Sequence, residues 1–315
     1  MINLNNNIKG ILYILLAMFI LAIQDICIKL LSNNINSFQI FFVRSVIGLI
    51  IILFFLQFTN RKIILKTHYP ILTLMRCLLF FFGFSCIFIS LSELSYPIAV
   101  TLFFSSPLFM IILSKIILKK NIGLKRWSAV LIGFVGVYIV MDPEFNNFNI
   151  YTIFPVLTAL AYSTTIVIQH KTADKDNLFS QTFHLLFSAM LLSLIACIVF
   201  GNGQFNIYES NALQFMFRKL TISFDTSLIL LILIGFAFSI GILFLFHAYR
   251  IAFPPNIAPY EYTLIIYALL FSWIIWGDTI DSKSIIGLLL IVGGGLYTFV
   301  IEIKKKKFVS VQKHL

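Results

Sequence analysis

Seven ionisable residues fall inside long apolar segments of this sequence: Asp25, Arg44, Arg76, Lys115, His184, His247 and Glu261. At the centre of a lipid bilayer each would cost about 2.5 to 3.5 kcal/mol unless it is paired or hydrated. Such residues commonly bind a solute, carry protons or pair with one another. Asp25 and Glu261 are the first candidates, because a carboxylate on a short side chain cannot reach the membrane surface.

The depth of these residues in their segments predicts two pairs of opposite charge. Asp25 and Arg44 each lie about seven residues from one face, roughly 10 Å deep at the rise of an α-helix. Arg76 and Glu261 each lie about six residues from the other face. We expect Asp25 to pair with Arg44, and Arg76 with Glu261. The alternative for both arginines is that their long side chains reach the surface, as we expect for Lys115.

Aromatic residues and a proline surround Glu261 in the stretch NIAPYEYT. Tyr260 and Tyr262 flank the acid directly after Pro259, and phenol rings suit an organic solute that is partly flat and partly polar. The two acids and two arginines of the apolar segments roughly cancel in charge. This balance favours a zwitterionic or mixed-charge solute over a simple cation.

Two histidines and the two acids are the candidates for proton coupling. His184 and His247 lie near the depth of Glu261, and a histidine side chain changes its charge near neutral pH. Coupling through Asp25 or Glu261 is one hypothesis, and uncoupled exchange is the other. The alternative for the histidines is a core side chain with satisfied hydrogen bonds.

The composition of the chain places these residues in a membrane protein. Hydrophobic residues make up 60% of the sequence and charged residues 11%, and the mean hydropathy is +1.00. A soluble domain has about 25% charged residues. Apolar segments near the roughly 20 residues that cross a bilayer span residues 9–31, 37–58, 71–92, 96–118, 124–141, 150–168, 178–200, 226–249, 255–276 and 284–303. The predicted fold class is an all-α polytopic membrane protein with ten transmembrane helices.

The basic residues are divided unequally between the two sides of the predicted membrane. Sixteen fall in loops on the side of the N terminus, whereas the opposite loops hold only Arg218, Lys219 and Lys283, or four with Lys29. Cytoplasmic loops collect Lys and Arg, so both termini are predicted to be cytoplasmic. The net charge of +11 is then explained by the basic cytoplasmic loops, which orient the chain in the membrane. We therefore expect no nucleic acid partner.

Two stretches half a chain apart share one pattern. LSYPIAVTLFFSSPLFMIILSKIILKKN (94–121) and IAFPPNIAPYEYTLIIYALLFSWIIWGD (251–278) both begin with an aromatic-proline step. Each carries a further proline, Pro107 or Pro259, that is predicted to interrupt its helix. With five helices in each half, the second half must be inverted relative to the first.

This repeat predicts the domains and the class of function. The expected units are two five-helix repeats, at 8–142 and 149–303, and a basic cytoplasmic tail at 304–315. Inverted repeats with interrupted helices are typical of alternating-access transporters, whose sites lie between the halves. The sequence therefore predicts a secondary transporter of a small organic solute.

Several stretches give the chain a likeness to a known family: SFQIFFVRSV (37–46), HYPILTLMRCLLFFFGF (68–84), FFSSPLF (103–109), RWSAVLIGFVGVYIVMDP (126–143) and APYEYT (258–263). In order and spacing they resemble the drug/metabolite transporter superfamily, and within it the EamA-type ten-helix carriers. The resemblance implies a bacterial inner-membrane carrier with a central cavity between two EamA-like repeats. The chain looks most like carriers of small metabolites such as S-adenosylmethionine, with riboflavin carriers and exporters of amino acids or drugs as alternatives.

Other classes of function find little support in the sequence. It contains no HExxH or GxSxG motif and no Asp/His cluster, so we expect neither an enzyme nor a catalytic residue. We expect no cofactor and no metal site, and a receptor or scaffold is the remaining alternative. The expected partners are a small-molecule substrate and the lipid bilayer. A homodimer is left open, because the glycine-rich GGGL stretch could equally pack within one chain.

Overall fold

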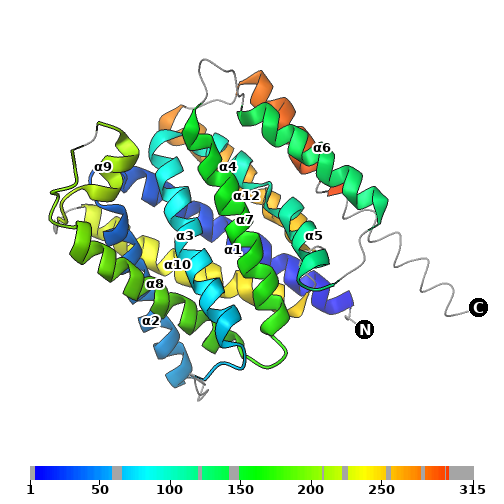
Figure 1. Cartoon of the computed structure of the whole chain (residues 1–315), viewed down its shortest axis with the longest axis horizontal. Coiled ribbons are helices and arrows are strands. Elements are labelled where there is room, and N and C mark those ends of the chain that lie inside the picture. The colour runs from blue at the N-terminus through cyan, green and yellow to red at the C-terminus, as the bar shows by residue number, and fades with distance from the viewer. Residues whose placement is uncertain are drawn as a thin grey trace, which may run out of the picture.

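Helices dominate the computed structural model of the chain (Figure 1). The structure describes residues 4–58, 66–119, 123–141, 149–207, 209–221, 226–252, 257–277, 281–294 and 296–297. Within these residues, seven helices are long and apolar enough to cross a membrane, and shorter apolar helices span Leu131–Val140, Tyr260–Trp276 and Ser282–Gly294. The predicted all-α polytopic fold with ten membrane segments is confirmed. The predicted tail at 304–315 lies outside the described residues.

The first half contains five membrane segments, close to the predicted positions. They are α1 (Leu4–Leu31), α2 (Ser37–Phe58), α3 (Pro70–Glu93), the short helices α4 (Tyr96–Phe103) and α5 (Ser106–Ile116), which together make one segment, and α6 (Leu124–Met141). A proline stands in the first turn of α3, α4 and α5, where its missing N–H leaves no helical hydrogen bond unmade. These prolines set the starts of the three helices.

The second half repeats this order with one addition. A 3-10 turn (Ile150–Thr152) leads into α7 (Ile153–Thr172), followed by α8 (Leu178–Phe200), α10 (Thr226–Ile251), a 3-10 turn (Ala258–Tyr262) leading into α12 (Thr263–Trp276), and a last helix (Ser282–Gly294). The addition is α9 (Asn211–Phe217), in the long loop after α8. Its Phe215 is buried and stacks on Phe88 of α3, so α9 packs on the bundle.

The fourth membrane segment is broken between α4 and α5. There the N–H of Ser105 bonds to the carbonyl of Leu102, three residues back instead of four. Pro107 follows in the first turn of α5, where it has no N–H to donate. The Ser163 hydroxyl of α7 donates to the carbonyl of Ser106 at 2.8 Å. The break thus brings polar backbone against a helix of the other half.

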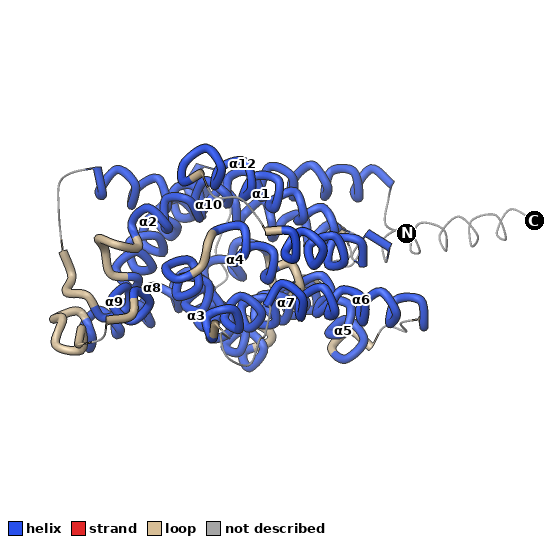
Figure 2. Tube along the Cα trace, turned by 90° about the horizontal axis from the view of Figure 1, so that it is seen from above, coloured by secondary structure: helices blue, strands red, loops and turns tan. Residues whose placement is uncertain are grey.

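The two halves pack as equivalents of each other. In the second half, α7 is the counterpart of α1, α10 that of α3, and α12 that of α4 with α5. α1 packs on α10 and α12, and α7 packs on α3, α4 and α5. α2 packs on its own counterpart α8, and α4 on α12. Figure 2 shows two layers, one with α1, α10 and α12 and the other with α3, α7 and α5, with α4 between them. This exchange of equivalent contacts is what the predicted inverted repeat requires.

Glycines bring α6 and the last helix, side by side in Figure 1, into backbone contact. A Cβ added at Gly136 would lie 2.6 Å from the carbonyl oxygen of Gly287, and one added at Gly287 would lie 2.7 Å from that of Gly136. Small residues let membrane helices approach this closely. Around Gly293, in the GGGL stretch, an added Cβ would meet nothing within 4 Å. The homodimer stays a prediction.

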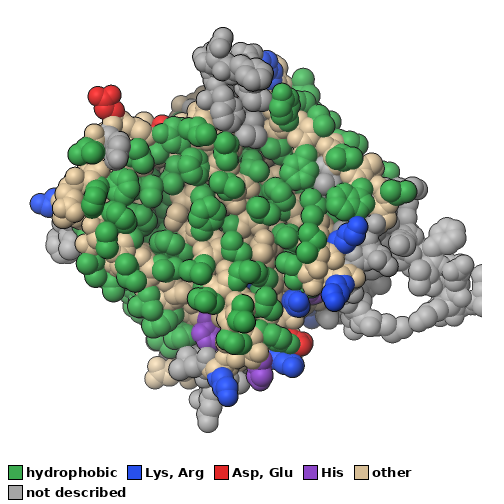
Figure 3. Space-filling model, viewed as in Figure 1, with side chains coloured by type: hydrophobic (Ala, Val, Ile, Leu, Met, Phe, Trp, Pro, Cys, Tyr) green, Lys and Arg blue, Asp and Glu red, His purple; other side chains and the backbone are tan. Residues whose placement is uncertain are grey.

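The outer surface of the bundle is apolar across its middle. Figure 3 shows hydrophobic side chains over most of the visible face, with the visible charged side chains toward its edges. Ile71 is 80% exposed and Ile198 is 73% exposed. Soluble monomers rarely expose contiguous apolar areas of this kind, whereas lipid requires them. The chain is therefore a multi-pass membrane protein.

Asp176, in the turn between α7 and α8, ties the start of α3 to the second half. Its Oδ2 accepts from the Thr67 hydroxyl at 2.5 Å, and its Oδ1 accepts from the backbone N–H of His68 at 3.0 Å. Nδ1 of His68 lies 3.0 Å from the same Oδ1, and Arg250 of α10 donates to the Asp176 carbonyl at 2.9 Å. Burial by itself raises the pKa of Asp176, but the hydrogen bonds from His68 and Thr67 outweigh it and lower the pKa.

We expect Asp176→Asn to lower the stability of the purified protein at neutral pH by about 1 to 3 kcal/mol, because the Thr67 hydroxyl and the His68 N–H lose a charged acceptor that is itself buried. A carboxylate with a lowered pKa stabilises the fold above its ordinary pKa of 3.8, and this contribution is lost as the pH falls through the folded-state value. Thermal unfolding in detergent should therefore separate the variant from wild type at pH 7 and bring them together in acid. Asp174→Asn, at an exposed neighbour, is the control. Identical melting of Asp176→Asn and wild type at pH 7 would contradict this role.

Candidate functional site

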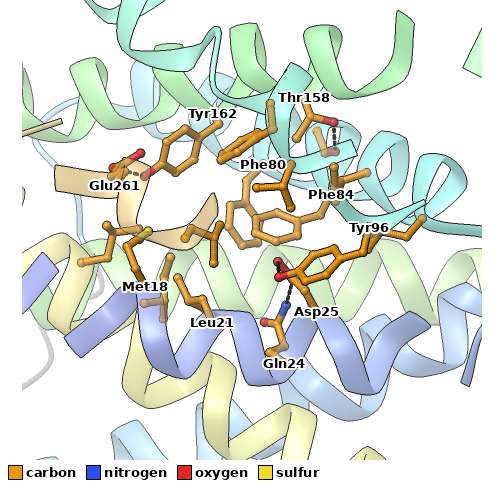
Figure 4. Close-up of a pocket in the computed structure, with 18 of the residues that line it drawn as sticks. Met18, Leu21, Gln24, Asp25, Phe80, Phe84, Tyr96, Thr158, Tyr162 and Glu261 are labelled. Atoms are coloured by element: carbon orange, nitrogen blue, oxygen red, sulfur yellow. Dashed lines mark hydrogen bonds between the residues drawn. The ribbon is translucent and has the colours of Figure 1, made fainter. Parts of the chain in front are cut away.

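A cavity of about 80 Å³ lies inside the bundle, between the two layers of helices. α1, α10 and the turn Ala258–Tyr262 with the start of α12 line one side, and α3, α4 and α7 line the other. Asp25 and Glu261, the two acids singled out from the sequence, both line it, and Figure 4 shows them apart with aromatic rings between. A solute in this cavity would contact both halves of the repeat.

Asp25 is positioned by its neighbour on α1 and by a tyrosine of α4. The side-chain amide of Gln24 donates to Oδ1 at 2.8 Å, and the Tyr96 hydroxyl donates to Oδ2 at 3.4 Å. Gln24 is itself buried, and its amide oxygen has no hydrogen-bond partner within the described structure. All three side chains line the cavity. This end of the cavity therefore offers mainly acceptors.

Glu261 is fully buried in the 3-10 turn before α12, and two tyrosines hold one of its oxygens. Oε1 accepts from the Tyr162 hydroxyl of α7 at 2.7 Å and from the Tyr249 hydroxyl of α10. Oε2 has no hydrogen-bond partner among the described residues. Leaving a buried charged acceptor unbonded costs about 1 to 3 kcal/mol or more. Oε2 is thus the carboxylate oxygen that remains able to bind a donor.

Aromatic and aliphatic side chains separate the two acids. Phe80 and Phe84 of α3 pack with ring centres 4.5 Å apart, and Phe103 of α4 lies 5.2 Å from the ring of Tyr162. Met18 and Leu21 of α1 face them across the cavity (Figure 4). Aromatic faces attract cations and flat rings. This lining is of the kind that suits a flat solute with positive charge.

The two predicted ion pairs do not form, and neither arginine reaches the surface. Arg44 is 0% exposed and Arg76 is 1% exposed, and neither lies within 4.0 Å of a carboxylate oxygen in the described part of the chain. Arg76 instead donates to the backbone carbonyl of Gln181 on α8. Arg44 is enclosed by phenylalanine rings. Residues at equal depth in the membrane need not be in contact, because depth does not determine the direction in which each side chain points from its helix.

Several other predicted site residues lie away from the cavity. The Tyr262 hydroxyl donates to the carbonyl of Ile291 at 3.3 Å, and Tyr260 does not line the cavity. His247 packs edge-on against Tyr13 at 4.9 Å between ring centres.

His184 of α8 does not line the cavity either, and its backbone carbonyl lies 3.5 Å from the sulfur of Cys77. Pro107 stands at the break between α4 and α5. Pro259 lies in the 3-10 turn that carries Glu261. Both prolines therefore adjoin segments that line the cavity.

Four side chains that hold the two acids were not predicted from the sequence: Gln24, Tyr96, Tyr162 and Tyr249. Each carries a polar atom inside an apolar segment, which is the signal that could have identified them. Tyr96 is also the aromatic residue of the aromatic-proline step in the first of the two repeated stretches. A search restricted to charged residues passes over hydroxyl and amide groups, although buried ones need partners as well.

The comparisons with known proteins agree with this architecture. The EamA-like transporter family matches residues 8–142 and 149–300. An S-adenosylmethionine uptake transporter of Rickettsia prowazekii (strain Madrid E) is 27% identical, over 98% of this chain and 97% of its own. One of Rickettsia felis is 28% identical, over 96% of both chains. A riboflavin transporter of Vibrio cholerae is 24% identical, over 95% of this chain and 96% of its own.

A solved crystal structure of another protein has the same fold. It superposes with a TM-score of 0.64, over 93% of this chain and 96% of its own, at 14% sequence identity. The fold and the interior cavity define a polytopic membrane transporter built from two inverted repeats. The chain belongs to the EamA-like transporter family, of the drug/metabolite transporter superfamily, as its sequence suggested.

Proposed function

We propose that this transporter is a secondary carrier that takes up a small organic metabolite by alternating access, with S-adenosylmethionine as its substrate. Relatives named for S-adenosylmethionine uptake align with it over nearly their whole length, which supports the substrate. Interrupted helices in an inverted repeat support the mode of transport. The basic loops favour cytoplasmic termini, and the bacterial relatives favour a bacterial inner membrane.

The observation that carries the substrate proposal is the make-up of the cavity wall. Asp25 and Glu261 line the cavity, whereas Arg44 and Arg76 do not. The sequence predicted that the charges of these two acids and two arginines cancel, but only the acids line the cavity. Acceptors with aromatic faces between them suit a cation that carries a flat ring. S-adenosylmethionine has a sulfonium group, an ammonium group and an adenine ring.

The size of the cavity bears on the state of the carrier. Its volume of about 80 Å³ is well below the roughly 300 Å³ or more of a pocket that encloses a drug-sized ligand. In our proposal this is the contracted state of the cycle, and relative movement of the two halves enlarges the space when a solute enters.

Proton coupling, in this proposal, runs through Asp25 and Glu261. Both line the cavity, where a solute cation and a proton would compete for the same oxygens. His184 and His247 lie outside the cavity, so this proposal gives them no role in proton coupling. Proton-dependent uptake that persisted in both Asp25→Asn and Glu261→Gln would contradict coupling and favour exchange.

Uptake of radiolabelled S-adenosylmethionine into proteoliposomes, without ATP, tests the function. We expect saturable uptake by wild type and a loss of roughly tenfold in Asp25→Asn, the effect of one hydrogen bond to a charged group. Asp174→Asn, which removes an exposed acid in the turn after α7, should transport like wild type.

Competition with riboflavin, adenosine and amino acids defines the specificity. Preferential uptake of riboflavin would move the substrate to the compound named for the Vibrio cholerae relative. If wild-type vesicles showed no ATP-independent flux of any of these compounds in either direction, the proposal of a metabolite carrier would fail.

A further inference from the structure

Arg44 of α2 is a fully buried arginine whose guanidinium group has no hydrogen-bond acceptor. None of its three side-chain nitrogens has a partner within the described structure. Asp25 acts on it electrostatically, yet the two form neither a hydrogen bond nor an ion pair within 4.0 Å. A guanidinium has five N–H donors, and buried donors are rarely left unbonded. Arg44 therefore keeps its full capacity to bind an acceptor.

Four phenylalanine rings enclose this guanidinium and form what we call the phenylalanine cage. The Cζ atom of Arg44 lies 4.0 Å from the ring centre of Phe238, 4.2 Å from Phe41, 4.5 Å from Phe84 and 5.4 Å from Phe88. Cation–π attraction stabilises the charge in this apolar setting, but it provides no carboxylate or carbonyl acceptor. The cage holds the cation in place and leaves its donors uncommitted.

Phe84 belongs to both the cage and the cavity. Its ring lies over the guanidinium of Arg44, and the same side chain lines the cavity beside Asp25 and Tyr96 (Figure 4). Phe80, its neighbour in the cavity wall, does not take part in the cage. Phe84 therefore borders both the buried cation and the space where a solute would bind.

We propose that Arg44 binds the carboxylate of the solute once the ring of Phe84 turns aside, so that the carrier selects metabolites that bear an amino-acid group. The inference rests on the proposed function and adds to it. Asp25 and Glu261 meet the cationic parts of the solute, and Arg44 meets its anionic part. A guanidinium binds a carboxylate through two parallel hydrogen bonds, which a lysine cannot reproduce.

Pairs of compounds that differ only in the carboxylate test this role. Unlabelled S-adenosylmethionine and its decarboxylated form would each compete with the uptake of radiolabelled S-adenosylmethionine. The two would be compared in wild type, Arg44→Met and Arg44→Lys. We expect wild type to prefer the carboxylate form, and Arg44→Met to lose this preference by roughly tenfold to a hundredfold. Arg44→Lys should recover only part of it. Arg76→Met, at a buried arginine outside the cavity, should leave the preference unchanged.

A binding measurement keeps this test separate from the choice of substrate. The shift in melting temperature of the purified protein with methionine and with 3-(methylthio)propylamine gives the same comparison without transport. Loss of the carboxylate preference in Arg44→Met, with the amine still bound, supports the inference. An equal loss for both compounds, or an unchanged preference, overturns it.

The substrate and the role of Arg44 can fail independently. If wild type takes up no S-adenosylmethionine but shows an Arg44-dependent preference for methionine, only the proposed substrate falls. Phe84→Leu provides a second variant in case Arg44→Met does not fold. It should strengthen the carboxylate preference by opening the path to Arg44, and a preference that is unchanged or weaker overturns the inference.

Discussion

Uptake of S-adenosylmethionine by Glu261→Gln should fall by a factor of roughly ten to a hundred, because the variant lacks one of the two acids that meet the cationic groups of the solute in our proposal. The replacement keeps the size of the side chain, and its amide oxygen can still accept from Tyr162 and Tyr249, which now hold Oε1. What is lost is the charge on the other oxygen, Oε2, which has no hydrogen-bond partner in the described residues. Initial rates of uptake in proteoliposomes, at matched protein content, measure this effect.

Tyr262→Phe is the matched control for this prediction. Tyr262 follows Glu261 in the chain, but its hydroxyl donates to the carbonyl of Ile291 and does not line the cavity. We expect uptake by this variant to stay close to wild type, and uptake by Tyr162→Phe to fall to an intermediate level. If Tyr262→Phe lost as much uptake as Glu261→Gln, Tyr262 would take part in transport, and its place outside the cavity would be wrong.

Gly136→Ala should destabilise the protein, although alanine favours helices more than glycine does. The added methyl group would lie 2.6 Å from the carbonyl oxygen of Gly287 and 2.9 Å from the side chain of Leu290. Because one of these atoms belongs to the backbone, α6 and the last helix would have to move apart. Overpacking of this kind costs about 1 to 3 kcal/mol. The melting temperature in detergent should therefore fall, and Gly287→Ala should have a similar effect.

Gly293→Ala, in the last helix with Gly287, gives the opposite expectation. A Cβ at Gly293 would meet nothing within 4 Å, so the gain in helix propensity, about 0.5 to 1 kcal/mol, is unopposed. The two substitutions are chemically identical and should differ in sign. If Gly136→Ala and Gly293→Ala both left the melting temperature unchanged, the close contact between α6 and the last helix would be wrong.

The family comparison narrows the function less than it narrows the fold. Relatives named for S-adenosylmethionine and for riboflavin share the full-length architecture at 24 to 28% identity. Similarity over the whole chain at this level therefore does not determine which solute is carried. In our proposal, Asp25, Glu261 and Arg44 are the residues whose charge bears most directly on the choice of solute.

The sequence by itself determined the membrane segments, the repeat and the two acids. Segments such as 37–58 and 178–200 were predicted from apolar composition alone and appear as α2 and α8. Prediction from composition succeeds because the bilayer imposes the same requirement on every membrane segment. Each needs enough apolar residues to cross the bilayer and must form its backbone hydrogen bonds internally. The acids stood out for the same reason, since a carboxylate within such a segment is costly wherever it points.

Only the tertiary structure decided which side chains meet. Depth along a helix predicted that Asp25 would pair with Arg44, whereas Asp25 contacts Gln24 and Tyr96, and Arg44 faces phenylalanine rings. Depth is one coordinate of three. The rotation of each helix about its axis, and the neighbour against which it packs, depend on contacts between residues far apart in the chain, such as Glu261 with Tyr162. A single sequence contains no local pattern that reports them.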